Sequence, residues 1–178
     1  MSHATAAAGD LLISHPYWSD EQRVCLITEH TAHSSLALEL NTPAEVTFAE
    51  LVMEKGISVG LNDRVYTGGD YNTHALVMLH DCDWYSSNTM QVDENWSISS
   101  DYHMIDKLAM GNLPTEFRVM LGITAWGKGD LDHELASAKS PWLLLQNPYP
   151  GLVMCEPDDQ YELAFKQFTK QCVSHFFD

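Results

Sequence analysis

Apolar residues occur in short runs separated by polar turns, and this pattern predicts an alternation of brief strands and helices. The runs that predict strands are 11–13, 24–28, 36–40, 65–67, 75–79, 90–92, 96–98, 117–123, 142–145 and 152–155. Pro16 closes the first run, because proline restricts the residue before it to extended conformations. The polar connection 29–35 predicts a hairpin between the second and third runs.

Helix signals fall between these runs. The segments that predict helices are 47–55, 101–110, 130–139 and the stretch from Pro157 to the C-terminal end. Thr47 and Glu50 have capping-box spacing, and Gly56 suits the left-handed residue after a helix. Ser99 or Ser100 is expected to cap the second helix, and Asp130 the third. In the last helix an apolar stripe of Tyr161, Phe165, Phe168 and Cys172 is expected to face the core.

The order of these elements predicts the fold class. Strands and helices are interleaved irregularly, with an early hairpin, which favours a mixed α+β fold over a doubly wound one. We interpret residues 1–10 as a flexible leader and residues 11–178 as one domain, since no repeat or long linker interrupts them.

The charge balance narrows the classes of partner. The chain carries 25 acidic and 9 basic side chains, for a formal net charge of −16. Such a field repels phosphates, so we expect no direct binding of nucleic acid. Solubility or adaptation to salt explains the acidity more simply than binding to a basic protein partner, although the charge alone does not separate these explanations. No apolar run approaches the roughly 20 residues that span a bilayer, and no secretory signal is recognisable, so a cytoplasmic protein without membrane contact is expected.

The four cysteines predict structural thiols. They are Cys25, Cys82, Cys155 and Cys172. These residues are widely spaced without a Cys-x-x-Cys pair, and three of the four lie in apolar runs. This usage favours reduced, buried side chains over disulfides or metal ligands.

Several sequence blocks together resemble the YqgE/AlgH family of bacterial proteins. In chain order these blocks are Leu12-Ile-Ser-His-Pro16, Val24-Cys-Leu-Ile-Thr-Glu-His30, Leu38-Glu-Leu-Asn-Thr-Pro43, Tyr66-Thr-Gly-Gly69, Val77-Met-Leu-His80, Ser99-Ser-Asp101 and Gly122-Ile-Thr-Ala-Trp-Gly-Lys-Gly-Asp-Leu-Asp-His-Glu-Leu135. The similarity covers about residues 11–145 and extends more loosely into the C-terminal helix. The chain departs from the family pattern at Thr42, Asp70, Ala125 and Asp130, where Lys, Pro, Gly and Gln are usual.

The resemblance implies a curved, partly barrel-like sheet packed by several helices. It implies no catalytic residues, because family members are mostly uncharacterised. Some are labelled transcriptional regulators, but this chain has no helix-turn-helix pattern and its charge opposes DNA.

Two groups of polar residues raise the possibility of an enzyme. His30 with His33, and His80 with Asp81 and Asp83, are ligand-type side chains, but their spacing fits no standard metal motif. Cys82 lies between two carboxylates, which disfavour a reactive thiolate, and no Gly-x-Ser-x-Gly elbow marks an activated serine. A metal-assisted or thiol-dependent enzyme using the His80 to Asp83 loop is therefore an alternative, with no catalytic residue, metal ligand or cofactor assigned.

Binding is the function that the sequence favours. Residues at predicted strand ends can converge on one pocket of a curved sheet, and here they are His30, Asn41, Gly69, His80 and Trp126. Gly68 with Gly69, and the Gly127-Lys128-Gly129 turn, could also direct backbone N–H groups at an anion. We therefore predict a protein that acts by binding or regulation, with an unidentified protein or small molecule as partner. An acidic mimic of nucleic acid, bound to a basic protein, is a second alternative.

Overall fold

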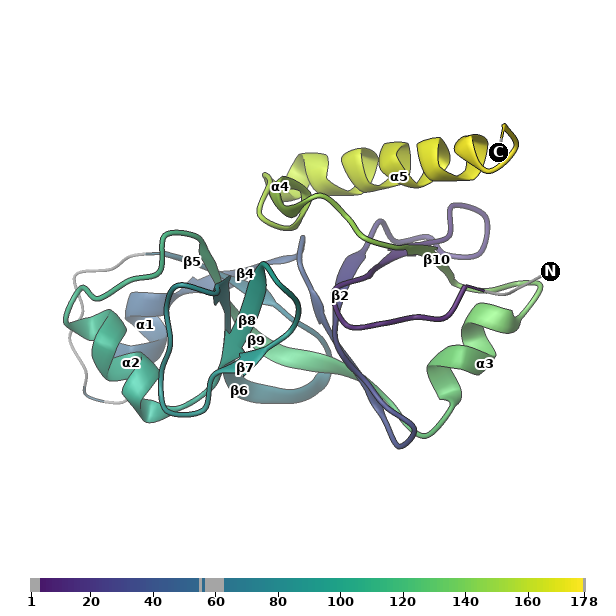
Figure 1. The fold of residues 1–178 in the computed structure, drawn as a ribbon. Helices are drawn as coiled ribbons and strands as arrows, with labels where there is room; N and C mark the ends of the chain where they lie inside the picture. The colour runs from purple at the N-terminus through teal and green to yellow at the C-terminus, as the bar shows by residue number, and fades with distance from the viewer. Residues whose placement is uncertain (1–3, 55, 57–62, 178) are drawn as a thin grey trace.

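A ten-stranded sheet organises the part of the chain that the structure describes. The computed structural model describes residues 4–54, 56 and 63–177 (Figure 1). The strands are β1 (Leu11–Ser14), β2 (Val24–His30), β3 (Ser35–Glu39), β4 (Pro43–Thr47), β5 (Arg64–Thr67), β6 (Tyr71–Asp81), β7 (Met90–Gln91), β8 (Trp96–Ser99), β9 (Phe117–Trp126) and β10 (Trp142–Leu145). Their order is β10-β1-β2-β3-β9-β6-β8-β7, and β4 joins through β5, which pairs with β9.

Strand β9 connects the two halves of this sheet. Its C-terminal end pairs with β3, whereas its N-terminal part pairs with β6 on one side and with β5 on the other. The pairing of β5 with β9 is parallel, and the other pairings of the sheet are antiparallel. In Figure 1, β9 runs from the half that carries α1 and α2 into the half that carries α3 and α5. Together the strands form a curled half-barrel, and with the helices they give the α+β fold that the sequence predicts.

Glycines permit the close crossing at the centre of the sheet. A Cβ on Gly69 would lie 2.2 Å from the carbonyl carbon of Ile123, and one on Gly122 would lie 2.4 Å from the carbonyl oxygen of Gly69. Gly122 also has φ of 76°, which side chains disfavour. The turn from β5 into β6 can therefore press against β9 only because both segments lack side chains at this point.

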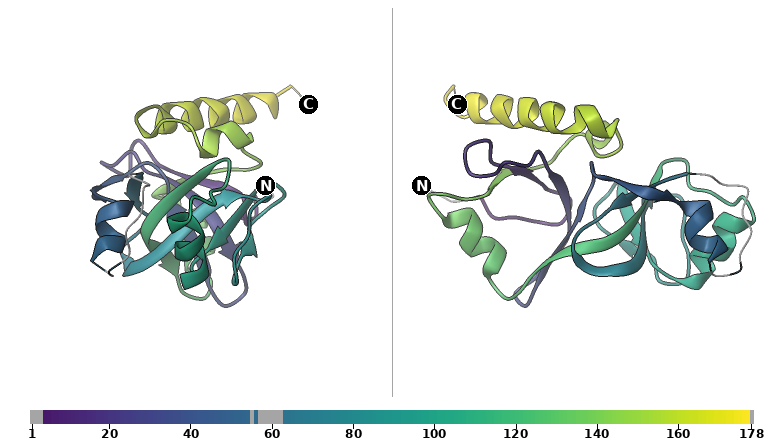
Figure 2. Two further views of the ribbon diagram at one scale, coloured as in Figure 1. Left: turned by 90° about the vertical axis from the view of Figure 1, so that its left-hand side faces the viewer. Right: turned by 180° about the vertical axis from the view of Figure 1, so that it is seen from behind.

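Over the residues that the structure describes, five helices cover the sheet: α1 (Phe48–Met53), α2 (Tyr102–Ala109), α3 (Asp130–Ala136), α4 (Pro150–Val153) and α5 (Pro157–Ser174). Helices α1 and α2 pack on a core cluster that includes Phe48, Met104 and Val119. Helices α4 and α5 cover a second cluster, and α3 covers a third around Leu131. Figure 2 shows α3 and α5 on opposite sides of the strands β1, β2 and β10.

The helix signals are confirmed in part. Thr47 and Glu50 form the predicted capping box, since Glu50 Oε2 accepts the Thr47 N–H at 2.7 Å and Thr47 Oγ1 accepts the Glu50 N–H. The helix itself ends at Met53, and Lys55 lies outside the described residues. The predicted caps of the next two helices are wrong, because Asp101 caps α2 and Gly129, without a side-chain bond, precedes α3.

One strand prediction is wrong, and one predicted helix stripe is confirmed only in part. Residues 152–155 form no strand; their first part belongs to α4, which begins at Pro150. In the stripe expected on α5, Tyr161 and Phe168 are half-buried and pack against a core cluster, whereas Cys172 at its end is exposed. The buried residues of α5 instead include Gln160 and Ala164, because the end of the helix extends beyond the sheet.

The N-terminal segment is packed rather than a free leader over the residues described. Ala6 is 3% exposed and belongs to the core cluster under α3. The Gly9 N–H donates to the Ile27 carbonyl at 2.8 Å, and the Asp10 carboxylate accepts the Ala7 N–H. Residues 4–10 therefore add an ordered border to the sheet.

Candidate functional site

A polar hollow lies where the ends of four strands meet, and we call it the strand-end hollow. Its volume is about 570 Å³. It is lined by Glu21, Gln22, Arg23, Glu39, Asn41, Thr42, Thr67, Gly69, Asp70 and Thr73. These residues come from the start of β2, the end of β3, the end of β5 and the start of β6, with the turns between them. The predicted convergence of strand ends is thus found for Asn41 and Gly69.

Asn41 and the glycine turn build the walls of this hollow. Asn41 Oδ1 accepts the Val24 N–H at 3.0 Å, and its Nδ2 donates to the Gln22 carbonyl at 2.7 Å. The Glu39 N–H donates to the Gly68 carbonyl at 2.8 Å. The Gly68 N–H donates to the Leu121 carbonyl, so it is not directed at an anion as the sequence suggested. Asn41 and Gly68 therefore shape the walls of the hollow through their hydrogen bonds to backbone groups of neighbouring segments.

A buried carboxylate dominates the electrostatics of the strand-end hollow. The Glu39 side chain is 9% exposed and accepts a hydrogen bond from the Thr42 hydroxyl. Arg23 Nη1 is 3.9 Å from Glu39, whereas Arg23 Nε is 2.7 Å from Glu21. Burial raises the pKa of Glu39, and the Thr42 hydrogen bond and Arg23 offset this only in part. The neighbours of Glu39 therefore compensate only in part for the cost of burying its negative charge.

A second polar cluster, which we call the α3 cluster, consists of His30, Ser35, Trp126, Asp132 and Glu134. His30 Nδ1 is 2.7 Å from the Ser35 hydroxyl, and its Nε2 is 3.2 Å from the Asp132 carboxylate. Serine, histidine and aspartate are connected as in hydrolytic triads, but the ring nitrogens are exchanged, because in those triads Nε2 faces the serine and Nδ1 the aspartate. Ser35 is 3% exposed, however, so a substrate carbonyl cannot reach its hydroxyl in this arrangement.

The tryptophan predicted as a site residue also belongs to the α3 cluster. Trp126 Nε1 and Trp142 Nε1 both donate to Glu134 Oε2, at 3.2 and 3.0 Å. The Arg23 guanidinium lies 5.1 Å from the centre of a Trp142 ring, which links this cluster to the strand-end hollow. The indole N–H of Trp126 therefore has a carboxylate from α3 as its partner.

His80 is not part of either site, and its assignment to a surface loop is wrong. His80 and Asp81 are the last residues of β6, and His80 is fully buried. His80 Nδ1 donates to the Asp81 carbonyl at 2.7 Å, so its Nε2 accepts the Ser99 hydroxyl at 2.8 Å. Its ring also packs edge-on against Trp84. An enzyme based on the His80 to Asp83 segment is therefore disfavoured, because its histidine cannot reach a substrate.

Acidification should weaken the fold through His80. Burial lowers the pKa of His80, while its contacts with Asp81 act in the opposite direction. The unfolded chain then binds a proton first as the pH falls below about 6.5, so stability decreases from there down to the folded-state pKa. Urea unfolding at pH 7.5 and pH 5.5 should show a smaller loss in His80→Gln than in the parent protein. Equal losses in both proteins would contradict this assignment.

The remaining sequence candidates stand apart from the two sites. Lys128 is exposed in the turn before α3 and lines neither site. All four cysteines are free, but Cys82 and Cys172 are exposed, which contradicts the expectation of buried thiols. Across the residues that the structure describes, no three His, Cys, Asp or Glu side chains lie close enough together to hold a metal ion.

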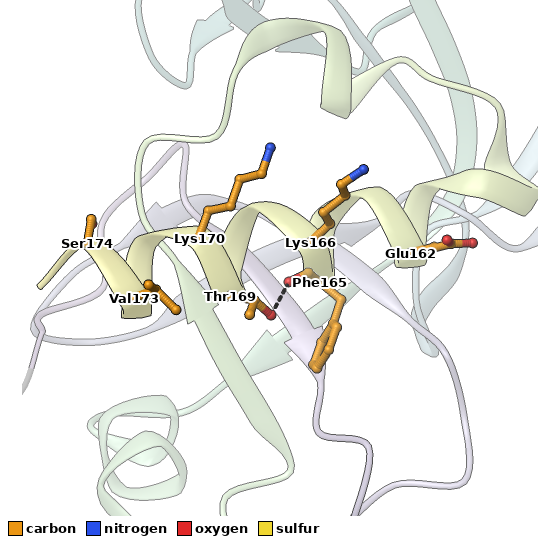
Figure 3. Close-up of a pocket in the computed structure, with 7 residues that line it drawn as sticks. All are labelled: Glu162, Phe165, Lys166, Thr169, Lys170, Val173 and Ser174. Atoms are coloured by element: carbon orange, nitrogen blue, oxygen red, sulfur yellow. Dashed lines mark hydrogen bonds between the residues drawn. The ribbon is translucent and has the colours of Figure 1, made fainter. Parts of the chain in front are cut away.

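A larger hollow of about 660 Å³ lies along α5. All of its lining residues belong to this one helix: Glu162, Phe165, Lys166, Thr169, Lys170, Val173 and Ser174. Figure 3 shows Lys166 and Lys170 projecting to one side of the helix and Phe165 to the other. This region is therefore an open helix face, without the converging polar groups that fix a small ligand.

Sequence reasoning missed the charged residues of both sites. Glu39 and Arg23 lie within or next to apolar runs, where alternation indicates only that every second residue faces the same side. Asp132 and Glu134 fall within the block that resembles the family, but nothing in their spacing shows that they meet His30 and Trp126. A signal was available for Asp70, since it departs from the family pattern beside the Gly-Gly turn.

The comparisons with known proteins identify the family. The sequence profile described as AlgH-like matches residues 11–172, and the chain belongs to this family. A UPF0301 protein of Marinomonas sp. is 31% identical over 160 residues, which is 86% of this chain and 84% of the relative. A UPF0301 protein of Bradyrhizobium sp. is 27% identical and covers 93% of this chain and 83% of its own length. The family is uncharacterised, and no specific activity accompanies the match.

Solved structures show the same fold. The solution structure of the AlgH protein from Pseudomonas aeruginosa superimposes with a TM-score of 0.78 at 21% identity, covering 94% of this chain and 92% of that protein. A crystal structure of a protein from Corynebacterium diphtheriae gives a TM-score of 0.69 at 18% identity, with coverage of 90% and 86%. In the described part of this chain, no helix combines the length and apolar character that crossing a membrane requires.

Proposed function

We propose that the protein acts by binding, and that the strand-end hollow takes a small organic cation such as a primary amine. The observation that carries this proposal is the Glu39 carboxylate, which is almost fully buried. Among the described residues its partners are one hydroxyl donor and a distant guanidinium. A buried charge of this kind costs free energy unless a counter-charge reaches it. An ammonium group in the hollow supplies that counter-charge.

The balance of charge around the hollow supports a cationic ligand. Three carboxylates line it, from Glu21, Glu39 and Asp70, against the one guanidinium of Arg23. That guanidinium is already held by Glu21 and by the Trp142 ring. The hydroxyls of Thr42, Thr67 and Thr73 add donors and acceptors for polar substituents.

Two departures from the family pattern make the hollow of this chain more acidic. Thr42 stands where the resemblance leads us to expect lysine, and Asp70 where it leads us to expect proline. Both residues line the hollow. One positive charge is thus replaced by a hydroxyl, and one carboxylate is added. We infer that preference for a cation is a property of this chain more than of the family.

The burial of the two side chains that most resemble catalytic residues favours binding over catalysis. His80 and Ser35 are buried, so neither reaches a substrate. A regulatory role would follow if amine binding altered contacts with another protein. Four free thiols also support a reducing compartment, and we therefore propose a cytoplasmic location. The acidic mimic of nucleic acid stays a prediction.

Glu39→Gln should abolish most of the affinity for amines. The side chain keeps its shape but loses the charge, and a hydrogen bond to a charged group contributes about 1.5–3 kcal/mol, or roughly a 10- to 100-fold change in Kd. Titration calorimetry with methylamine, ethanolamine and 1,4-diaminobutane measures this directly. Asp70→Asn should weaken binding less, by under about fivefold, because its carboxylate is exposed.

The matched control is Glu94→Gln, which removes one carboxylate from an exposed position outside the hollow. Its affinity for amines should equal that of the parent protein. Trp142 fluorescence offers a second measure of occupancy, since Arg23 joins its ring to the hollow. The proposal is wrong if no amine binds at millimolar concentration, or if Glu94→Gln and Glu39→Gln weaken binding equally.

A further inference from the structure

Arg118 is a buried cation that pairs with neutral groups. Its side chain projects from β9, and the residue is 6% exposed. Nη1 donates to the Leu40 carbonyl at 2.8 Å and to Gln160 Oε1 at 3.0 Å, while Nη2 donates to the Cys155 carbonyl. The guanidinium lies 4.8 Å from the centre of the Tyr66 ring. These contacts provide acceptors for three of its five N–H groups. All three acceptors are uncharged, so they do not neutralise the guanidinium.

The charge of Arg118 lacks a direct counterion. Among the ion pairs found over residues 4–54, 56 and 63–177, none includes this guanidinium. Burial lowers the pKa of Arg118, and the nearby cation of Arg64 lowers it further, although Tyr66, Cys155 and Glu156 act in the opposite direction. Two arginines therefore approach each other in a chain with only 9 basic side chains. Such an arrangement of like charges is unfavourable unless an anion joins them.

Both arginines line one hollow, which we call the arginine hollow. Its volume is about 280 Å³, and it lies between β5, β9 and the connection from α4 to α5. Tyr66 and Met154 form apolar parts of its wall, and Asp63, Glu116 and Glu156 add carboxylates. The hollow thus places two cations and three anions around a space suited to a small metabolite.

We propose that the arginine hollow binds a free α-amino acid. The ligand carboxylate would be held by Arg64 and by the unused N–H groups of Arg118, since guanidinium groups match the planar geometry of a carboxylate. The ligand ammonium would be held by Glu116 and Glu156. This site is separate from the strand-end hollow and does not depend on the function proposed for it.

The acidic wall distinguishes an amino acid from other anions. A phosphate carries more negative charge than a carboxylate and meets Glu116 and Glu156 without an ammonium to neutralise them. A simple carboxylate such as acetate engages the arginines but leaves the glutamates unpaired. A zwitterion satisfies both pairs, and it adds little to the overall net charge of −16.

The test is calorimetry on the full chain with the common L-amino acids, N-acetylglycine, acetate and inorganic phosphate. At least one amino acid should bind, and the probes without an ammonium should bind at least tenfold more weakly. Arg64→Gln should weaken amino acid binding about tenfold, because one charged contact is lost while the exposed side chain contributes no buried packing. Glu116→Gln should weaken amino acids but leave acetate unchanged.

Lys128→Gln is the matched control, since it removes one exposed cation from the turn before α3. It should bind amino acids as the parent protein does. The inference is overturned if no amino acid binds, if phosphate binds more tightly than every amino acid, or if Arg64→Gln and Lys128→Gln have equal effects. Amine binding at the strand-end hollow should persist in Arg64→Gln, so failure of either proposal is recognised separately.

Discussion

Replacing Arg118 with methionine should lower the free energy of unfolding by about 3 kcal/mol, because it leaves buried acceptors without donors. The Leu40 and Cys155 carbonyls and Gln160 Oε1 each lose a hydrogen bond. Gln160 is itself fully buried and donates to the Leu152 and Val153 carbonyls, so the change also loosens α4 and α5. Urea unfolding followed by circular dichroism measures the loss.

Arg64→Met is the control for this substitution, because it makes the same chemical change at an exposed arginine nearby. Its effect should stay within about 0.5 kcal/mol, as for most surface positions. If the two variants lose stability equally, or if Arg118→Met is as stable as the parent protein, Arg118 does not anchor the C-terminal helices. Hydrogen exchange should locate the loss of protection in α5 first.

Gly69→Ala should be the most damaging small substitution, with an expected loss of about 4 kcal/mol or failure to fold. The new Cβ would lie 2.2 Å from the carbonyl carbon and oxygen of Ile123, which belong to the backbone of β9. Backbone at the centre of the sheet cannot move aside without breaking the pairings of β5 and β6 with β9. Thermal unfolding and yield of folded protein report this effect.

Gly151→Ala provides the contrast. Its Cβ would meet only the Tyr149 ring at 3.5 Å, and the residue lies in α4. Alanine should therefore be neutral or stabilise the protein by about 0.5–1 kcal/mol, since glycine disfavours helices. A large loss in both variants would show that the sensitivity of Gly69 does not arise from the crossing with β9.

The candidate site could be predicted from the sequence only in part. Asn41 and Gly69 were expected at converging strand ends, and both line the strand-end hollow. His30 and Trp126 instead meet at the other end of the strands, in the α3 cluster with Asp132 and Glu134. Strand ends are recognisable from turn residues, but the end of the sheet at which each lies depends on strand order. That order is not encoded in local periodicity.

His80 illustrates a different limit. Its neighbours Asp81 to Asn88 are polar, so the pattern favoured a loop, yet β6 continues to Asp81. The pairing of His80 with Ser97 in β8 and with Phe117 in β9 extends the strand into this polar segment. Tertiary pairing outweighs composition here because each ladder position satisfies backbone groups that a loop would leave to water.

The sequence by itself determined the short alternating elements, the capping box at Thr47, the glycine turns and the acidic surface, because these depend on neighbouring residues and on composition. Its family resemblance further predicted the curled sheet. Only the tertiary structure decided which charges meet. Glu39 acquires its burial, and Arg118 its neutral hydrogen-bond partners, from segments far apart in the chain. Desolvation and pairing of charge are properties of the assembled fold, which local patterns do not determine.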